Sequence, residues 1–562
     1  MNDRSNRRPA QRGRAGAATV ALAVAALAGG VLAPPATAGP VADSAALAKA
    51  KPGKPGKPSK PTRTVTAPDS RALQKAVTLR GVRSHLRELQ KIADQNDGNR
   101  ASGNPGYRAS RDYVVRTLRK AGYRPSVQAF DFDYFEQLAP ATLARVEGAT
   151  TTPFAEGTDF ALMDYSGSGD LTAAVQAVDL NLGDLAGSTS GCEAADFAGF
   201  TAGSIALIRR GTCAFGDKVV NAQTAGAAGV IIMNTGTEGA TDAFAGTLGG
   251  AVARIPAVGA SFAVGQSLAS GATVRLAAST RSEVRKTWNV LAESRQGRRS
   301  NVVMAGAHLD SVVEGAGIND NGSGSAALLE VAVQMAKQKT KPRNRVRFAW
   351  WGAEEKGLLG AEHYVGDLAE NDPDTLDEIA LYLNFDMVGS PNYALFVYDG
   401  DNSGEFEDGA VGPKGSGAIE ALFHDHFKGA GLRSAETSFS GRSDYGPFID
   451  QDIASGGLFT GAEGVKTKAQ AKAFGGKAGV AYDECYHAEC DDLGNVSKKA
   501  LDANSDAIAH AVHTYAQSTW SVNRKGPKLR GETRKAAKPH DPRLNDAAGG
   551  GGHDHGHALP GN

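Results

Sequence analysis

The stretch "NVVMAGAHLDSVVEGAGINDNGSGSAALLEVAVQM", residues 301–335, decides the fold of this protein. It opens with a continuous apolar run, passes through a glycine-rich segment that holds His308, Asp310 and Asp320, and ends in a helical pattern of apolar residues. A buried strand followed by a helix is typical of α/β proteins with a parallel sheet. The charged side chains follow the end of the strand, where such sheets bind their ligands.

The same order recurs on both sides of this stretch. Towards the C-terminus, amphipathic helical patterns alternate with apolar runs such as "RVRFAWWGA", "IALYLNFDMVG" and "ASGGLFTG". Towards the N-terminus, residues 70–122 show two helical patterns, and "PSVQAFDFDYF" alternates as a strand does. We therefore predict a domain formed by residues 71–148 and 287–520, with a mostly parallel mixed β-sheet covered by helices on both faces.

Residues 149–286 differ in composition from the segments around them. They are rich in Gly, Ala and Thr, and they contain short β-type runs such as "SIALIRR" and "GVIIMN" with few long helical patterns. This block is interpreted as a separate small, β-rich domain inserted into the larger one.

The N-terminus has the pattern of a secretory signal peptide. Arginines precede an apolar run over residues 15–33, and the small residues Ala36-Thr37-Ala38 follow it, so residues 1–38 are predicted to be removed after Ala38. A membrane anchor is the alternative, and the Ala/Gly-rich run argues against it. The Arg7-Arg8 pair suggests twin-arginine export, but the residues after it favour the general secretory route.

Two further segments lack a pattern that could bury apolar surface. Residues 39–70 are rich in Lys, Pro and Gly and are interpreted as a linker or pro-segment, and residues 521–562 are interpreted as a disordered tail rich in His and Gly. The 61 basic and 61 acidic residues give no net charge, so we expect no nucleic-acid partner. We also expect no membrane contact after signal cleavage, and a monomer.

The four cysteines are consistent with export, because an even number of cysteines in a secreted chain usually forms disulfides. Four cysteines allow three connectivities. Proximity in the sequence favours Cys192 with Cys213 and Cys485 with Cys490.

Acids and imidazoles gather after the predicted strands. Taken singly, each is more often a cap, a turn or a surface residue. Together they indicate a divalent-metal site, because buried carboxylates in this number repel one another unless cations neutralise them. The residues concerned are His308, Asp310, Asp320, Glu354, Glu355, Asp386 and His487.

The spacing of these residues suggests different tasks. His308 and Asp310 are two residues apart, so on an extended segment Asp310 can accept the second imidazole N–H of His308. Glu354 and Glu355 are adjacent and must diverge, so one can bind metal while the other acts as general base. An acid-rich helix N-terminus is the alternative for this pair.

Six motifs in this order resemble the secreted bacterial di-zinc aminopeptidases of metallopeptidase family twenty-eight (M28), the leucine-type enzymes. They are "GAHLDS", "GINDNGSGSAALLE", "WWGAEEKGLLGAEHY", "LNFDMVG", "SGRSDYGPF" and "CYHAEC". The resemblance implies the zinc exopeptidase, phosphorylase/hydrolase-like fold. The inserted block, with "SGCEAADF" and "IPAVGAS", resembles a protease-associated (PA) domain.

Carried over motif by motif, the resemblance implies two zinc ions per chain. Their ligands would be His308, Asp320, Glu355, Asp386 and His487. Glu354 would be the general base, Asp310 would orient His308, and Tyr486 would donate a hydrogen bond to the developing oxyanion. Arg442 resembles an arginine near the carboxylate end of bound product, and a solvated loop arginine is its alternative. Calcium remains an open question: Asp491 and Asp492 are interpreted as exposed acids after the disulfide.

The function that follows is hydrolysis of N-terminal residues, large and apolar ones such as Leu, from peptides with a free N-terminus. A hydroxide that bridges the metals would attack the peptide carbonyl, and Glu354 would transfer its proton. Arg442 keeps a carboxypeptidase or dipeptidase open as alternatives. A one-zinc cyclising acyltransferase or a non-catalytic peptide-binding protein fits less well, because all five ligand positions are filled.

Overall fold

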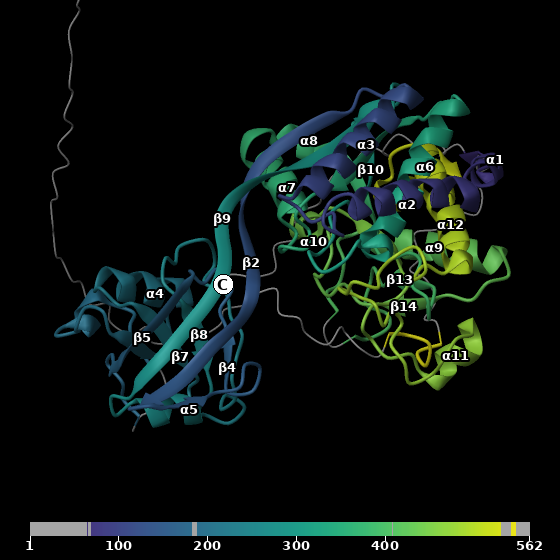
Figure 1. Ribbon diagram of the computed structural model, residues 1–562. Coiled ribbons are helices and arrows are strands. Elements are labelled where there is room, and N and C mark those ends of the chain that lie inside the picture. Colours follow the sequence, from purple (N-terminus) through teal and green to yellow (C-terminus); the bar gives the residue numbers. More distant parts are fainter. Residues whose placement is uncertain (1–63, 66–68, 183–187, 407–408, 530–540, 547–562) are drawn as a thin grey trace, which may run out of the picture. The chain divides into compact units, whose positions relative to one another are not determined.

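The computed structural model describes residues 64–65, 69–182, 188–406, 409–529 and 541–546, which form an α/β fold of helices and strands (Figure 1). The larger domain and the small inserted domain each have buried clusters of their own. The predicted signal peptide and nearly all of the predicted linker lie outside the described residues. In the part of the chain that is described, no helix has both the length and the apolar character needed to cross a membrane.

The larger domain is built on a mixed sheet whose centre is parallel. Strand β10 pairs in parallel with β11 and β12, and β12 pairs in parallel with β15, while β9 adds antiparallel to β11, and β2 adds antiparallel to β9. The strand order is β14 (Ala435–Thr437), β13 (Phe396–Tyr398), β15 (Ser455–Phe459), β12 (Ile379–Phe385), β10 (Arg298–His308), β11 (Asn344–Trp351), β9 (Thr273–Glu293), with β2 (Ser126–Glu147) beside β9.

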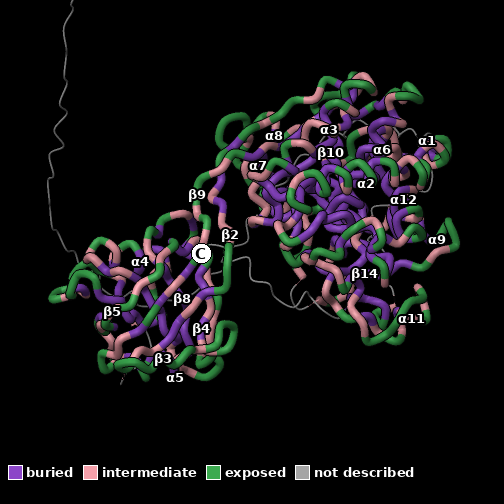
Figure 2. The backbone as a smooth tube through the Cα atoms, in the orientation of Figure 1, coloured by how far each residue is buried: buried purple, intermediate pink, exposed green. Residues whose placement is uncertain are grey.

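Both faces of this sheet are buried, which explains the continuous apolar runs in the sequence. Along β10, Val303 and Ala305 pack into one core cluster, whereas Met304 between them packs into a cluster on the opposite face. Trp350 and Trp351 of β11 divide in the same way. The buried positions run through the middle of the domain in Figure 2.

Helices pack against both faces of this sheet and contribute residues to both clusters. One cluster includes residues from α1 (Arg71–Ala76), α2 (Leu79–Asp94), α3 (Pro105–Ala121), α6 (Gly324–Lys337), α9 (Ser416–Gly429) and α12 (Lys498–Gln517). The other includes residues from α7 (Leu359–Asn371), α8 (Pro373–Asp377) and α10 (Gly446–Asp450). The predicted sheet with helices on both faces is therefore confirmed.

The inserted block forms a small domain with its own core. Its parallel strands β5, β6, β7 and β8 are fully or partly buried, and β4 pairs antiparallel with β8. The elements are β3 (Thr150–Pro153), β4 (Phe160–Leu162), β5 (Gly169–Ala177), β6 (Ile205–Arg209), α4 (Phe215–Thr224), β7 (Gly229–Met233), β8 (Ala257–Ala260) and α5 (Phe262–Leu268). Ala141 and Leu143 already belong to this core, so we place its beginning before residue 149.

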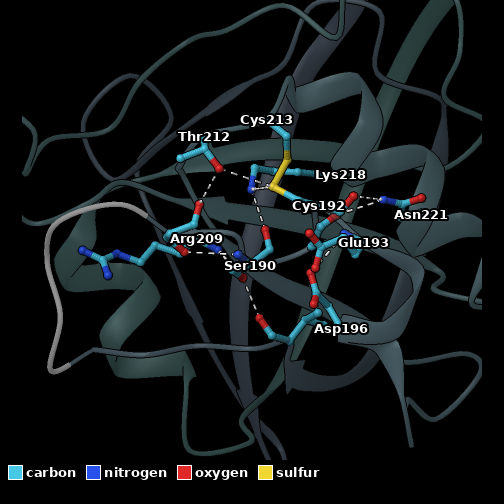
Figure 3. Close-up of a disulfide and its surroundings, with 12 residues drawn as sticks. Ser190, Cys192, Glu193, Asp196, Arg209, Thr212, Cys213, Lys218 and Asn221 are labelled. Carbon is cyan, nitrogen blue, oxygen red and sulfur yellow. Dashed lines mark hydrogen bonds between the residues drawn. A yellow bond between two sulfur atoms is a disulfide. The ribbon is translucent and has the colours of Figure 1, made fainter. Parts of the chain in front are cut away.

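The disulfide Cys192–Cys213 lies in this small domain and confirms the expected pairing (Figure 3). Lys218 of α4 is buried beside it and donates to the carbonyl oxygen of Ser190 and to Cys192 Sγ. Burial lowers the pKa of Lys218 to about 8.

The expectation of a disordered tail after residue 520 is wrong for two short stretches. Strand β16 (Lys528–Leu529) pairs in parallel with β1 (Thr64–Val65), and α13 (Trp520–Asn523) precedes it. Leu544 is buried against Phe396 and Tyr482. A single leucine between polar residues has no periodicity, which is why the sequence pattern missed this contact.

Candidate active site

The predicted site residues come together at the carboxyl ends of three neighbouring strands. His308 is the last residue of β10, Asp386 directly follows β12, and Glu354 and Glu355 follow β11. Asp320 lies in the turn Ile318–Ser323 that leads into α6. His487 reaches the same place from a loop that is closed by the disulfide Cys485–Cys490, which confirms the second expected pairing.

Asp320 lies between the two histidines. Its Oδ1 is 3.2 Å from Nε2 of His308, and its Oδ2 is 3.2 Å from Nε2 of His487. Asp386 Oδ1 lies 3.3 Å from His308 Nε2, and Glu355 Oε2 lies 3.0 Å from His487 Nε2. The five predicted ligands therefore form two sets that share the carboxylate of Asp320.

Glu354 and Asp310 lie beside the His308 half of this arrangement. Glu354 Oε2 is 3.7 Å from His308 Nε2. Asp310 Oδ1 is 3.6 Å from His308 Nδ1 and accepts a hydrogen bond from the backbone N–H of Glu354. Asp310 thus lies behind the imidazole, as the spacing predicts, at a distance beyond that of a direct hydrogen bond.

The carboxylates of the site favour protonated histidines and would favour a bound cation. Burial alone would lower the pKa of His308, but the carboxylates of Glu354 and Asp386 outweigh it and raise that pKa well above its usual range. In the same way, burial is outweighed by Glu355 and Asp320 at His487, whose pKa is raised to about 11. Burial raises the pKa of Glu354 well above its usual range. A divalent cation would relieve this concentration of negative charge.

The residues also pass a chemical test for metal binding. Glu355 Oε1 and Asp386 Oδ1 are buried and have no hydrogen-bond partner in the described part of the chain. Buried carboxylate oxygens without partners are rare unless an ion satisfies them. Imidazole nitrogens with carboxylate oxygens are a donor set that suits zinc.

Tyr486 and Arg442 contact each other beside these ligands. Arg442 donates to Glu463 Oε1 at 2.9 Å, and its second nitrogen lies 3.4 Å from the hydroxyl of Tyr486. Burial, and then the carboxylates of Asp320 and Glu355, raise the pKa of Tyr486 well above its usual range, so the phenol stays protonated. Arg442 is therefore paired with an acid in the site, with 28% of its side chain exposed.

Two supporting residues were missed in the sequence. Asp491 is buried, contrary to the expectation of an exposed acid, and its carboxylate accepts the backbone N–H groups of Asn319 and Asp320. Arg100 is buried and donates to the carbonyl oxygens of Leu309, Ala316 and Gly317. Both hold the backbone that carries the ligands. Neither has a distinctive motif around it, so only the fold reveals them.

A pocket opens directly over the converging ligands. Its wall includes apolar and aromatic side chains, namely Met387, Tyr398, Tyr445 and Phe459. Its floor and rim include the ligands together with Tyr486, Arg442, Glu463 and Asp546. The pocket thus combines an acidic floor with an apolar side wall.

This site can be compared with those of known proteins. Residues 289–512, which contain every predicted ligand, match peptidase family M28, and residues 171–268 match the PA domain. An aminopeptidase of Pseudomonas aeruginosa is 49% identical over 458 residues, which cover 80% of this chain and 83% of that protein. The chain belongs to peptidase family M28. The expected M28 peptidase with an inserted PA domain is confirmed.

Two further comparisons agree with this family. Leucine aminopeptidase 2 of Trichophyton rubrum is 40% identical over 460 residues, covering 79% of the M28 chain described here and 86% of the fungal protein. Among solved structures, the aminopeptidase from Aneurinibacillus sp. strain AM-1 has a TM-score of 0.58 and 25% identity, covering 84% of this chain and all of that one. The prediction of a metallo-aminopeptidase is thereby confirmed at the level of the family.

Proposed function

We propose that the protein is an exported zinc aminopeptidase that removes large apolar residues from the N-termini of peptides. The observation that carries the proposal is the position of Asp320, which offers one carboxylate oxygen to each of two histidine-containing ligand sets. One zinc ion would be held by His308, Asp386 and Asp320, and a second by His487, Glu355 and Asp320.

Zinc in this position supplies a Lewis acid that polarises the peptide carbonyl and lowers the pKa of bound water. Glu354 is the group that accepts a proton from the attacking water and delivers it to the leaving amine. Its Oε2 lies 3.7 Å from His308 Nε2, farther than the oxygens of Asp320 and Asp386, at 3.2 and 3.3 Å. Tyr486 donates its hydroxyl proton as a hydrogen bond to the carbonyl oxygen as negative charge develops there. Asp310 restrains the His308 ring.

The charges around the pocket support a free N-terminus as the recognised group. Besides the three carboxylates that the proposed zinc ions would neutralise, the lining carries those of Glu354, Glu463 and Asp546. Arg442, the lining arginine, already pairs with Glu463. An ammonium group is therefore favoured over a carboxylate, which argues against the carboxypeptidase alternative.

The pocket wall supports the preference for apolar side chains. Met387, Tyr398, Tyr445 and Phe459 provide apolar surface that a leucine side chain would cover. Burying such a side chain contributes roughly 1.5–3 kcal/mol. The name of the Trichophyton relative, a leucine aminopeptidase, agrees with this preference.

Export through the predicted signal peptide accords with the two disulfides. The decisive experiment follows amino acid release from Leu-Gly-Gly and from its N-acetylated form by the purified protein. We expect release from the free-amine peptide alone, its loss on chelation and its return with zinc. Release from the acetylated peptide at a similar rate would reject the aminopeptidase proposal.

A further inference from the structure

A second group of buried acids lies outside the two ligand sets described above. Asp399 directly follows β13, Asp401 lies two residues later, Glu420 belongs to α9, and Glu436 is in the middle of β14. Asp399, Glu420 and Glu436 are each at most 1% exposed. We call these four residues the acid cluster. The peptidase chemistry makes no use of them.

Three carboxylates of the acid cluster converge, and the fourth belongs to a second set. One oxygen from each of Asp399, Asp401 and Glu420 lies within 4.8 Å of the other two. Glu420, Glu436 and His424 offer a second such set with the same limit. Glu420 belongs to both sets, so it stands at the centre of the group.

Three oxygen atoms here lack a hydrogen bond within the part of the chain described, and the contact of Glu420 Oε1 with His424 Nε2, at 3.8 Å, is too long to be one. Asp401 Oδ1, Ser403 Oγ and Glu420 Oε1 are closed off from solvent and have no hydrogen-bond partner among the described residues. Glu420 is itself 0% exposed, and its other oxygen accepts the backbone N–H of Gly400. The proposed zinc ligands Glu355 and Asp386 show the same signature. Buried oxygens of this kind need a further partner, and a bound cation is one that would satisfy all three.

The nearest basic group to Glu420 is the imidazole of His424, whose Nε2 lies 3.8 Å from Glu420 Oε1. Within the described ranges, Asp399, Asp401 and Glu420 form no ion pair with a lysine or an arginine. Burial, followed by the charges of Asp399 and Asp401, raises the pKa of Glu420 to about 9. Either a proton or a cation must therefore compensate the buried charge.

The loop of residues 399–404 supplies oxygen ligands, and these indicate which cation would bind. Residues 399–404 read "DGDNSG", which resembles the first half of a calcium-binding loop of the D-x-[DN]-x-[DN]-G-x5-E type. Ser403 stands where that motif has Asp or Asn, and Ala410 stands where it has Glu, so Glu420 of α9 would supply the missing carboxylate. Carboxylate and hydroxyl oxygens suit calcium, a hard ion that accepts six to eight oxygens. We propose that Asp399, Asp401, Ser403 and Glu420 form a calcium site, distinct from the zinc ligands.

The test uses the purified full chain, stripped of metal, reloaded with two equivalents of zinc and then equilibrated with radioactive calcium. Glu420→Gln and Asp401→Asn remove ligand charge with little change in shape, and Asp425→Asn removes an exposed acid from the same helix as a matched control. Binding by equilibrium dialysis and thermal unfolding at increasing calcium are measured for all four proteins.

We expect the wild type and Asp425→Asn to bind calcium and to melt at higher temperature as calcium rises towards about 10 mM, well above the roughly 0.1–1 mM affinities of weak calcium modules. Glu420→Gln and Asp401→Asn should each bind one calcium ion fewer per chain, or bind it at least about tenfold more weakly. If Glu420→Gln does not fold, Asp401→Asn still decides. Calcium binding that is equal in wild type and variants, or absent from the wild type, would overturn the assignment.

Discussion

At the scale of single residues, two adjacent glutamates face different halves of the active site. Glu355 Oε2 lies 3.0 Å from His487, whereas Glu354 Oε2 lies 3.7 Å from His308. Because the side chains diverge, replacing Glu355 should affect metal binding, and replacing Glu354 should affect proton transfer.

Glu354→Gln is therefore expected to lower kcat by about a hundred-fold or more, while zinc content stays the same, since an amide cannot accept the proton of water. Initial rates on Leu-Gly-Gly and zinc analysis of the same sample check this. Glu489→Gln, at an exposed position close in sequence to His487, is the matched control and should keep wild-type activity. A fully active Glu354→Gln variant would remove Glu354 from its assigned role.

Lys218 gives a second prediction, on stability against pH. Its pKa falls from 10.5 in the unfolded chain to about 8 in the folded protein because it is buried. Between these values the unfolded chain holds a proton that the folded protein has lost, so this lysine makes stability rise as pH increases from about 8 to 10.5.

Lys218→Met should remove that rise, which is on the order of 1–3 kcal/mol. Urea unfolding at pH 7.5 and pH 10 measures it, and the comparison with wild type cancels the contributions of all other groups. An identical pH dependence in the two proteins would show that burial does not shift this lysine.

Some of the site residues could be predicted from the sequence around them, and others could not. The ligands could be predicted because each follows an apolar run, so the fold delivers them to one edge of the sheet. Asp491 and Arg100 could not be predicted, because they act through backbone groups that become neighbours only after folding. The pairing of Arg442 with Glu463 is likewise a product of the fold.

At the scale of elements, the loop that carries His487 depends on a covalent closure. Cys485 and Cys490 join its ends, with their Cα atoms 5.3 Å apart. The histidine has a left-handed backbone conformation, with φ of 54°, which the loop must maintain. Without the disulfide the ligand would have to be ordered at the expense of chain entropy.

Replacing Cys485 and Cys490 by serine should cost about 2 kcal/mol in the chain-entropy model for so short a loop, and it should weaken zinc binding and lower kcat/KM. Replacing Cys192 and Cys213 is the matched control: it should cost about 3 kcal/mol in the small domain and leave kcat/KM unchanged. Zinc titrations and kinetics on both double variants test this. Equal kinetic loss in both would contradict a local role for the first disulfide.

Helices and strands could be predicted where their apolar residues recur at regular spacing. The buried strands and the helices of the larger domain could be predicted because two faces of apolar residues leave a strong pattern. The short stretch around Leu544 has no such pattern, and its place depends on packing against Phe396 and Tyr482, which other segments supply.

At the scale of the whole molecule, the larger domain and the small inserted domain each have a buried core of their own. The larger core includes Val303 and Trp350, and the small domain's core includes Leu207 and Ile231. Proteins with two cores commonly depart from two-state unfolding, so each core is expected to have its own transition.

Removing zinc should therefore lower the transition of the larger core alone, because the metal binds only its folded form. Calorimetry with and without chelator tests this, and the Cys192→Ser/Cys213→Ser variant identifies the other transition. With zinc at a hundred times its dissociation constant, binding should add about 2.7 kcal/mol to the free energy of unfolding. A chelator that shifted both transitions equally would show that the cores unfold as one.

The order of the residues along the chain carries a consequence for how such a protein can evolve. Every predicted ligand, from His308 to His487, comes after β9, the strand that leads out of the inserted domain and ends at Glu293. The insert can therefore be exchanged, lengthened or lost between β2 and β9 without interrupting the segment that performs the chemistry.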